Sequence, residues 1–305
     1  MMRHGRWCLG TAAGLVLSGL AAAQETPERT PLSFELRTGV EYDSNVAALE
    51  IDASSGEGDV AALLGAHVGL ESDPGRRLKL DAAYDFSQSM HQEFEAFDLR
   101  IHMGSAGVGY DFGPVTAGMA YQLADAALGG EEYLVLKQAS PYLSRLFGKR
   151  LYFRLGWIRT DQEFTTAPAR DGVAQGPNLD TFLFLDGVKR YLTFGYERTD
   201  EDAADDTFDY SGVKLKGQIT HRLRWGSREM TLKGGLRHES RSYRQAGLLE
   251  PRREDARDRL DAEAEWPLFR HALLRARYEY ASNRSNLASV NFDEHVASVT
   301  LGLRH

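Results

Sequence analysis

The stretch ALLRARYEYASNRSNLASVNFDEHVASVTLGLRH, residues 272–305, ends the chain with two runs of alternating apolar and polar side chains around a polar segment. Side chains of a β-strand alternate between two faces, so a run with a period of two places its apolar residues on one face. Soluble sheets also show this alternation, so the hairpin alone does not decide between a soluble and a membrane protein. The residues that share a face are Leu274, Ala276, Tyr278 and Tyr280 in the first run and Val299, Leu301 and Leu303 in the second.

The same alternation recurs twelve times upstream, which predicts fourteen strands in all. The fourth run changes parity between Met103 and Ala106, and this predicts a β-bulge or a misplaced strand. The sixth run is irregular and contains Pro141. The upstream runs cover residues 33–43, 64–70, 78–87, 98–111, 115–123, 133–146, 151–157, 179–185, 192–196, 210–223, 230–239 and 260–266.

The connections between the runs alternate in length. Those after the second, fourth, sixth, eighth, tenth and twelfth runs are tight turns such as DPG, FGP, FGK, DG and WGS, and the others are longer and polar. Short turns on one rim, long loops on the other and an even strand number are typical of an outer-membrane barrel, and a soluble sandwich has no reason to keep this rhythm. The aromatics near run ends fit interfacial girdles; they are Tyr42, Trp157, Tyr196, Trp225 and Trp266.

We therefore expect an all-β protein, a transmembrane antiparallel up-and-down barrel of about fourteen strands with short periplasmic turns and longer extracellular loops. Residues 1–23 join a basic start, an apolar core and a small-residue end before Gln24, the pattern of a cleaved secretory signal. Residues 24–32 are read as a short periplasmic lead and residues 33–305 as the barrel. The expected location is the Gram-negative outer membrane.

The composition limits the possible functions. The only cysteine, Cys8, lies in the predicted signal, so the mature chain has no disulfides. Without the signal the chain has 34 basic and 44 acidic residues, and 34 minus 44 gives a formal charge of −10, which argues against nucleic-acid binding. After the signal no run of 18 apolar residues follows, so helical membrane spans are not expected. The mean hydropathy of −0.41 is compatible with alternating strands.

The polar faces of the predicted strands carry charges of both signs and would line the lumen. Two interpretations are open: a polar conduit that guides a solute or an extended chain, or mutual ion pairing that fills the interior. A barrel of fourteen strands lies between small filled barrels and wide porins, so its size does not decide. The predicted lumen residues are Glu35, Arg37, Glu41, Lys79, Asp81, Asp85, Arg154, Glu197, Lys214, Lys216, Arg222, Lys233, Arg237, Glu239, Asp261, Glu263, Glu265, Arg275, Arg277 and Glu279.

No catalytic or metal motif stands out. The acidic residues Asp200, Glu201, Asp202, Asp205, Asp206 and Asp209 follow no EF-hand spacing, so a solvated loop is the simpler interpretation and no metal is expected. The histidines form no HExxH or paired zinc pattern. Those in or beside strands, His102, His221, His238 and His295, have no nucleophile in a recognisable motif beside them. We expect no enzyme and no cofactor.

The segments GVEYDSNV (residues 39–46) and YEYASNRSN (residues 278–286), with the ending NFDEHVASVTLGL, resemble the carboxy-terminal barrel of the surface lipoprotein assembly modifier family. The resemblance implies a fourteen-stranded translocation barrel. In that family a periplasmic helical-repeat domain precedes the barrel; only residues 24–32 stand there, so we expect a barrel without that domain. The final residue is His305, where barrel-assembly signals usually end in an aromatic residue such as phenylalanine.

The expected function is a passage across the outer membrane, and a translocation or export barrel is the specific form that the resemblance implies. A closed structural or surface-interaction barrel and a small-solute porin are the alternatives. The expected partners are outer-membrane lipid and lipopolysaccharide, the barrel-assembly machinery, and an exported lipoprotein or a separate periplasmic repeat protein, with no nucleic acid. The last strand, with Val299, Leu301, Leu303 and His305, would be the segment presented to the assembly machinery.

Overall fold

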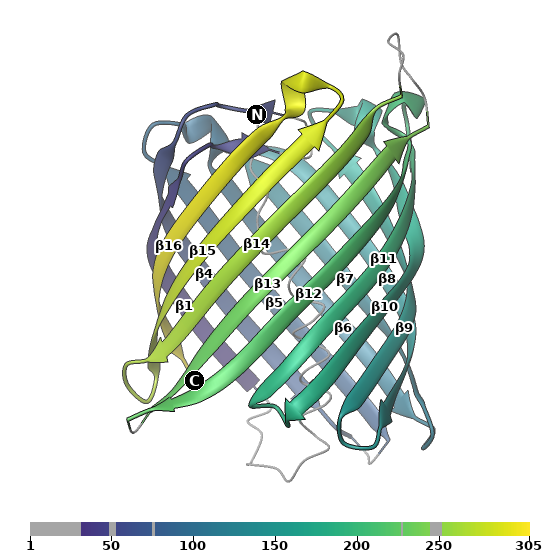
Figure 1. The fold of residues 1–305 in the computed structure, drawn as a ribbon, viewed down its shortest axis with the longest axis vertical. Helices are drawn as coiled ribbons and strands as arrows, with labels where there is room; N and C mark the ends of the chain where they lie inside the picture. The colour runs from purple at the N-terminus through teal and green to yellow at the C-terminus, as the bar shows by residue number, and fades with distance from the viewer. Residues whose placement is uncertain (1–31, 49–52, 75–76, 227, 245–251) are drawn as a thin grey trace.

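A computed structural model describes residues 32–48, 53–74, 77–226, 228–244 and 252–305. Fourteen strands form one closed antiparallel barrel in which chain neighbours are also sheet neighbours, and β1 pairs with β16 to close it (Figure 1). The predicted all-β barrel is confirmed. The predicted signal and lead lie outside the described residues, except Leu32, which begins β1. The barrel strands are β1 (Leu32–Asp43), β4 (Asp59–Ser72), β5 (Leu78–His91), β6 (Leu99–Asp111), β7 (Thr116–Leu128), β8 (Glu131–Phe147), β9 (Leu151–Phe164), β10 (Gly172–Asp186), β11 (Arg190–Ala203), β12 (Tyr210–Trp225), β13 (Arg228–Tyr243), β14 (Glu254–Pro267), β15 (Ala272–Ser285) and β16 (Phe292–Arg304).

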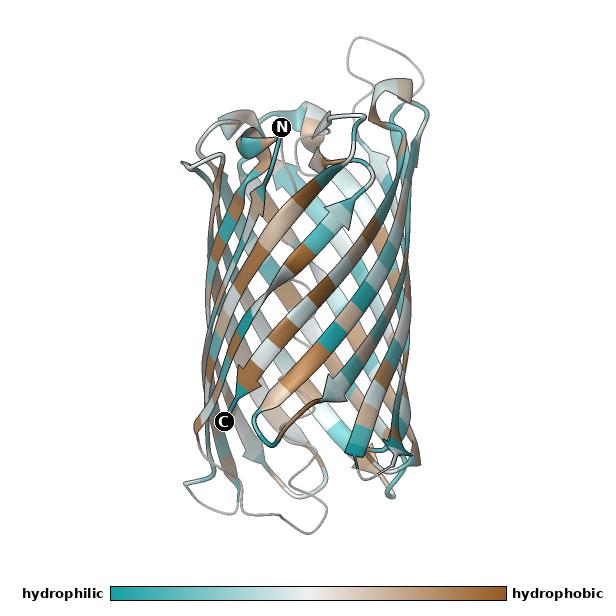
Figure 2. Cartoon of the chain, turned by 90° about the vertical axis from the view of Figure 1, so that its left-hand side faces the viewer, coloured by the Kyte–Doolittle hydropathy of each residue, from teal (hydrophilic) through white to brown (hydrophobic). Residues whose placement is uncertain are grey.

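The barrel is apolar outside and charged inside. Outward side chains such as Leu236, Leu260 and Phe194 are 56%, 55% and 52% exposed, whereas Glu279 on the inner face is 1% exposed. Figure 2 shows the resulting alternation of hydrophobic and hydrophilic residues along each strand. In a water-soluble protein the burial pattern would run the other way. An apolar outer surface of this extent fits a lipid environment, in which a closed sheet leaves no unpaired edge.

The two rims differ as the sequence predicts. One carries the tight turns, and the other carries longer connections that contain short 3-10 helices and a small hairpin (Figure 1). Within the described residues no helix is long and apolar enough to cross a membrane. The elements of the long-loop rim are β2 (Ala47–Ala48), β3 (Ala53–Ser54), η2 (Glu95–Phe97), η3 (Pro168–Arg170), η4 (Asp206–Phe208) and η5 (Ala288–Val290).

One connection on the long-loop rim departs from the prediction. A longer loop was expected after the fifth run, but β7 and β8 extend until only Gly129 and Gly130 remain between them. Their φ values of 54° and 88° lie in the left-handed region that a two-residue hairpin turn requires at both positions and that glycine adopts without strain. A register shift at Ala126/Ala127 accompanies the turn.

The parity change in the fourth run was predicted to reflect a β-bulge or a misplaced strand, and both explanations are wrong, because β6 occupies nearly the predicted residues. Its ladders to β5 and β7 run without a register shift from Leu99 onward. The parity changes because Leu99, Ile101 and Met103 are buried on the inner face, whereas Val108 and Tyr110 are exposed on the outer face. The half of β6 nearer the long-loop rim therefore directs apolar side chains toward the interior.

Several strands are longer than predicted, and two prolines lie inside the wall. Because β9 reaches Phe164 and β11 reaches Ala203, Trp157 and Tyr196 lie in mid-strand and not near strand ends as predicted. Strand β10 begins at Gly172, in the predicted loop, and includes Pro177. The ladder pairs are interrupted around Pro141 between β8 and β9 and around Pro177 between β10 and β11, because proline has no N–H to donate.

Candidate functional site in the barrel interior

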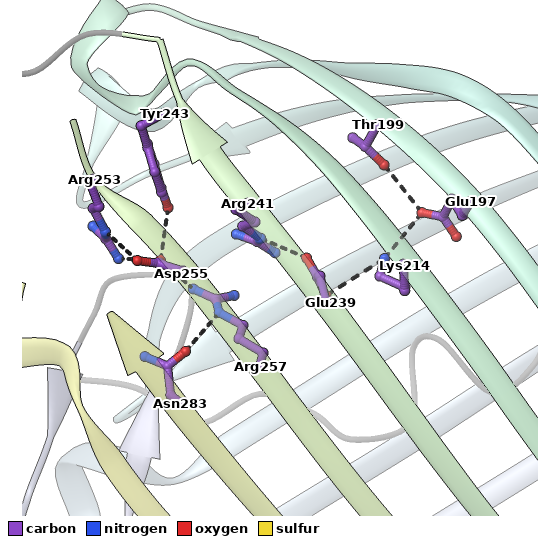
Figure 3. A network of polar contacts seen from close by, with 10 residues as sticks. All are labelled: Glu197, Thr199, Lys214, Glu239, Arg241, Tyr243, Arg253, Asp255, Arg257 and Asn283. Carbon is purple, nitrogen blue, oxygen red and sulfur yellow. Dashed lines mark hydrogen bonds and ion pairs between the residues drawn. The ribbon is translucent and has the colours of Figure 1, made fainter. Parts of the chain in front are cut away.

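Charged side chains of neighbouring strands form a ladder across the inner wall of β11 to β13 (Figure 3). The Nζ atom of Lys214 lies 3.1 Å from Oε1 of Glu197 and 4.0 Å from Oε2 of Glu239. Glu239 in turn accepts a hydrogen bond of 2.6 Å from Nε of Arg241. Since cross-strand pairs of opposite charge stabilise a sheet, this alternation supports the register of three strands.

A second cluster continues the ladder to β15. Asp255 accepts hydrogen bonds of 3.0 and 2.8 Å from Arg253 and one of 3.4 Å from the hydroxyl of Tyr243. Arg257 lies 3.8 Å from the same carboxylate and donates 3.1 Å to the Asn283 side chain (Figure 3). The bidentate contact from Arg253 fixes the carboxylate orientation as well as its charge.

A third cluster lies toward the short-turn rim and bridges the closing seam. Lys233 donates to Glu263 at 2.8 Å and to Glu265 at 2.9 Å. Arg275 then joins Glu265 at 3.1 Å to Glu35 at 3.4 Å. Arg275 lies on β15 and Glu35 lies on β1. This contact therefore spans the seam closed by β16 and connects the first strand of the chain to its last hairpin.

Glu279 is a carboxylate of the inner wall that is only 1% exposed, and it holds two arginines, Arg259 at 3.1 Å and Arg277 at 2.8 Å. We expect Glu279→Gln to lower the free energy of unfolding by about 1.5–3 kcal/mol, because hydrogen bonds to a charged group contribute about that much. Glu254→Gln at the exposed start of β14 is the matched control, with an expected change within about 0.5 kcal/mol. Equal losses in urea titrations of both refolded variants would contradict a role for the buried carboxylate.

The register places all twenty predicted lumen residues on the inner face of their strands. Beyond the clusters above, Asp85 pairs with His67 at 2.9 Å, and the guanidinium of Arg154 stacks 3.9 Å above the ring of Tyr142. Arg222 is exposed near the short-turn rim. That these residues line a conducting path remains a prediction.

The charged ladder also contains Arg241, Asp255 and Arg257, which are not among the predicted lumen residues. The eleventh predicted run ends at Glu239 and a loop is predicted over residues 240–254, whereas β13 continues to Tyr243 and β14 begins at Glu254. The sequence does carry the pattern that extends this strand, because every second residue from Glu239 through Arg241 to Tyr243 remains on the inner face.

An apolar surface inside the barrel was missed altogether. Inward residues of β6 to β9 form a buried cluster with T-shaped contact between Tyr133 and Phe164, whose ring centroids lie 5.6 Å apart. We call the part that lines the interior the apolar wall; it consists of Leu99, Ile101, Met103, Leu134, Leu136 and Phe164. Apolar side chains of the predicted strands were all expected to face lipid, so an inward apolar surface was not predicted.

A cavity of about 280 Å³ lies between the apolar wall and the charged ladder. Arg170 and Phe208 from the long-loop rim lie at its margin, with the guanidinium 4.2 Å from the ring centroid. Seven basic and two acidic residues line it, so its polar side is cationic. The basic residues are Arg170, Lys214, Lys216, Arg237, Arg241, Arg257 and Arg259, and the acidic residues are Glu197 and Glu201.

The acidic segment around η4 engages its own backbone. Asp205 accepts hydrogen bonds from the Thr207 N–H at 3.0 Å and hydroxyl at 2.8 Å, and these bonds lower the pKa of its carboxyl. Asp209 accepts 2.7 Å from the Ala203 N–H. Among the described residues, no group of three or more histidine, cysteine or acidic side chains is arranged to hold a metal ion.

The four histidines considered in the sequence, His102, His221, His238 and His295, face outward. His102 contacts the Tyr84 hydroxyl at 2.7 Å, His295 contacts that of Tyr278 at 2.8 Å, and His238 pairs with Asp258 at 2.7 Å. These contacts place aromatic and imidazole rings on the outer surface toward the long-loop rim. The expectation that the protein is not an enzyme remains a prediction.

Two of the segments that carry the family resemblance, residues 39–46 and the ending at residues 291–303, meet at the closing seam. Asn45 accepts hydrogen bonds from Ser54 and Gly56 and donates 3.3 Å to the Asp293 carbonyl on β16. The N–H of His295 donates 2.8 Å to the Ser44 hydroxyl, and the N–H of Ser44 donates 2.9 Å to the His295 carbonyl. These motif residues thus join the first loop to the last strand.

The last strand completes the barrel. Val299, Leu301 and Leu303 are 47%, 43% and 54% exposed on its outer face. The backbone of His305 exchanges hydrogen bonds of 2.9 and 3.2 Å with Phe34. The strand therefore pairs along its length with β1 and β15 and offers an apolar face outward.

Comparison with solved structures finds barrels of the same kind. The chain is similar to an anion-selective porin from Comamonas acidovorans, with 10% identity and a TM-score of 0.51 over 90% of this chain and 98% of that chain. It is also similar to the outer-membrane expressed OmpT of Vibrio cholerae, with 9% identity and a TM-score of 0.53 over 92% of this chain and 100% of that chain. No protein-family model and no curated protein sequence matches. At this identity the likeness shows an outer-membrane barrel fold.

Proposed function

We propose that the protein resides in the Gram-negative outer membrane and provides a passage for small solutes. The observation that carries the proposal is the cavity of about 280 Å³ inside a closed barrel whose inner wall is charged and whose outer wall is apolar. The predicted signal at residues 1–23 supports export to that membrane. Lipopolysaccharide and the barrel-assembly machinery are the partners that such a barrel requires.

The size and walls of the cavity favour a small solute over an extended polypeptide. Its volume lies just below the range of about 300–1,000 Å³ of sites that enclose small ligands. The carboxylates and cations around it are held by one another at 2.6–4.0 Å, as between Glu239, Lys214 and Arg241. A wall whose charges hold fixed positions suits recognition of one compact solute.

Conductance in planar lipid bilayers tests the passage. The refolded barrel is expected to insert and give discrete current steps in potassium chloride, because ions accompany water through a polar lumen. Insertion is checked independently by protease protection of the same protein in liposomes. Inserted barrels that give no steps at any voltage would overturn the proposal in favour of a closed structural or surface-interaction barrel.

Export of a lipoprotein is the second candidate, and the resemblance of residues 39–46 and 278–286 to surface lipoprotein assembly modifiers favours it. Its partners would be a lipoprotein and a separate periplasmic repeat protein. The seam contacts of Asn45 and Ser44 with Asp293 and His295 give residues 39–46 a structural role as well. Surface labelling of lipoproteins in a strain that lacks the gene tests export: loss of one lipoprotein from the surface supports it, and an unchanged set contradicts it.

A further inference from the structure

Three cations stand side by side on the inner wall where the rest of the ladder alternates in sign. Lys216 is the direct cross-strand neighbour of Arg237, which is the direct neighbour of Arg259. The adjacent row, by contrast, reads Lys214, Glu239 and Arg257. Like charges directly opposite each other destabilise a sheet, so this row needs a compensating anion. We call Lys216, Arg237 and Arg259 the cation row.

The ends of the cation row have carboxylate partners within 4.0 Å, whereas its centre, Arg237, has only a longer-range interaction with the carboxylate of Asp261. Nζ of Lys216 lies 3.5 Å from Glu197, and Nε of Arg259 lies 3.1 Å from Glu279. Within the part of the chain that the structure describes, no carboxylate lies within 4.0 Å of the Arg237 guanidinium. Arginine offers a planar pair of donors that matches one carboxylate group, so Arg237 is suited to bind an anion from solution.

The apolar wall lines the same cavity as the cation row. The apolar wall belongs to β6, β8 and β9, which lie seven, five and four positions around the fourteen-stranded barrel from β13, the central strand of the cation row, so the two surfaces lie on different sides of the lumen. A solute in the cavity therefore meets guanidinium groups on one side and Ile101, Leu134 and Leu136 on the other. Burial of apolar surface of the solute against these side chains favours binding.

We propose that the cavity binds amphipathic monoanions, that is, carboxylates carried by an aromatic ring or a short apolar chain. Arg237 binds the carboxylate and the apolar wall binds the ring or chain. A small hydrophilic anion makes no contact with the apolar wall, and a neutral apolar molecule offers no anion to Arg237. The idea deepens the proposed passage by naming its solute class.

Binding to the folded barrel in lipid nanodiscs tests the site without any need for conduction. The probes are benzoate, its neutral isostere benzamide, and acetate, each measured by isothermal titration calorimetry. We expect benzoate to bind at least tenfold more tightly than benzamide or acetate, because only benzoate uses both surfaces. Equal affinities for all three probes would overturn the proposal.

Single substitutions separate the two surfaces. Arg237→Gln is expected to weaken benzoate at least tenfold and leave benzamide unchanged, whereas Arg237→Lys restores part of the loss. Leu136→Gln is expected to weaken benzoate and benzamide severalfold and to leave acetate unchanged. The matched control is Arg222→Gln, which removes an inward cation near the short-turn rim outside the cavity. Equal effects of Arg237→Gln and Arg222→Gln would contradict a specific role for the cation row.

Failure of the site and failure of the passage give different results. Selective benzoate binding by a barrel that shows no bilayer current overturns the passage and keeps the site. Current steps from a barrel that binds benzoate no better than benzamide keep the passage and overturn the site. Heat-modifiable migration of each variant on gels confirms that it is folded before either result is used.

Discussion

Removal of residues 299–305 is expected to abolish insertion of the barrel. The deletion removes the half of β16 that pairs with both β1 and β15 toward the short-turn rim, together with the outward side chains Val299, Leu301 and Leu303. In lipid every unpaired backbone group costs several kcal/mol, so a barrel with a gap of this length has no stable membrane-embedded form. The measurement is the fraction of heat-modifiable protein recovered in outer membranes.

A side-chain control separates closure from recognition by the assembly machinery. Ser298→Ala with Thr300→Ala changes only the inner face of the same strand and is expected to insert normally. Val299→Ser with Leu301→Ser keeps the backbone pairs but removes the apolar outer face, and is expected to reduce recovery. Normal recovery of heat-modifiable barrel from the deletion itself would show that the segment is dispensable.

Leu236→Arg is expected to lower the free energy of unfolding in lipid by about 2–4 kcal/mol, the typical cost of an arginine on the lipid face of a barrel at the midplane. Leu236 lies in the middle of β13 and is 56% exposed on the outer wall. The loss follows from placing a cation in hydrocarbon. Urea titrations of the barrel folded in liposomes measure it.

Gln218→Arg introduces the same charge one strand away on the inner face, where Gln218 pairs with Gly235, the residue beside Leu236. We expect a much smaller loss there because the side chain remains among polar groups. Equal losses at the two positions would mean that the exposed apolar face is not in contact with lipid.

The sequence predicts the architecture because the barrel repeats one simple pattern. Alternation with a period of two in residues such as Leu274, Ala276 and Tyr278 specifies a strand with two different faces. The alternation of short turns and longer loops along the chain specifies the two rims. It does not predict strand ends, because polar residues continue on both faces where a strand leaves the membrane. Residues 199–203, assigned to a loop, therefore belong to β11.

The interior is harder to predict, because apolar and charged residues on a strand do not reveal which surface they face when the pattern changes. Leu99 and Ile101 contradict the rule that apolar side chains meet lipid, and the parity change at Met103 was the trace of this in the sequence. The contact between Glu35 and Arg275 depends on closure of the barrel across 240 residues, which local periodicity cannot encode. The cation row likewise depends on the register of three strands.

The prolines of β8 and β10 make one sector of the wall easier to open than the rest. Pro177 lies directly opposite Trp157 on β9, and the ladder on the other side of β9 is interrupted at Pro141. Amide hydrogens of β9 near Trp157 should therefore exchange with deuterium earlier than those in the middle of β13, whose ladders to both neighbours are continuous. Strands β8 and β9 also carry part of the apolar wall. Local opening of their hydrogen-bond ladder would therefore let the cavity change its width while the charged side of the barrel stays rigid.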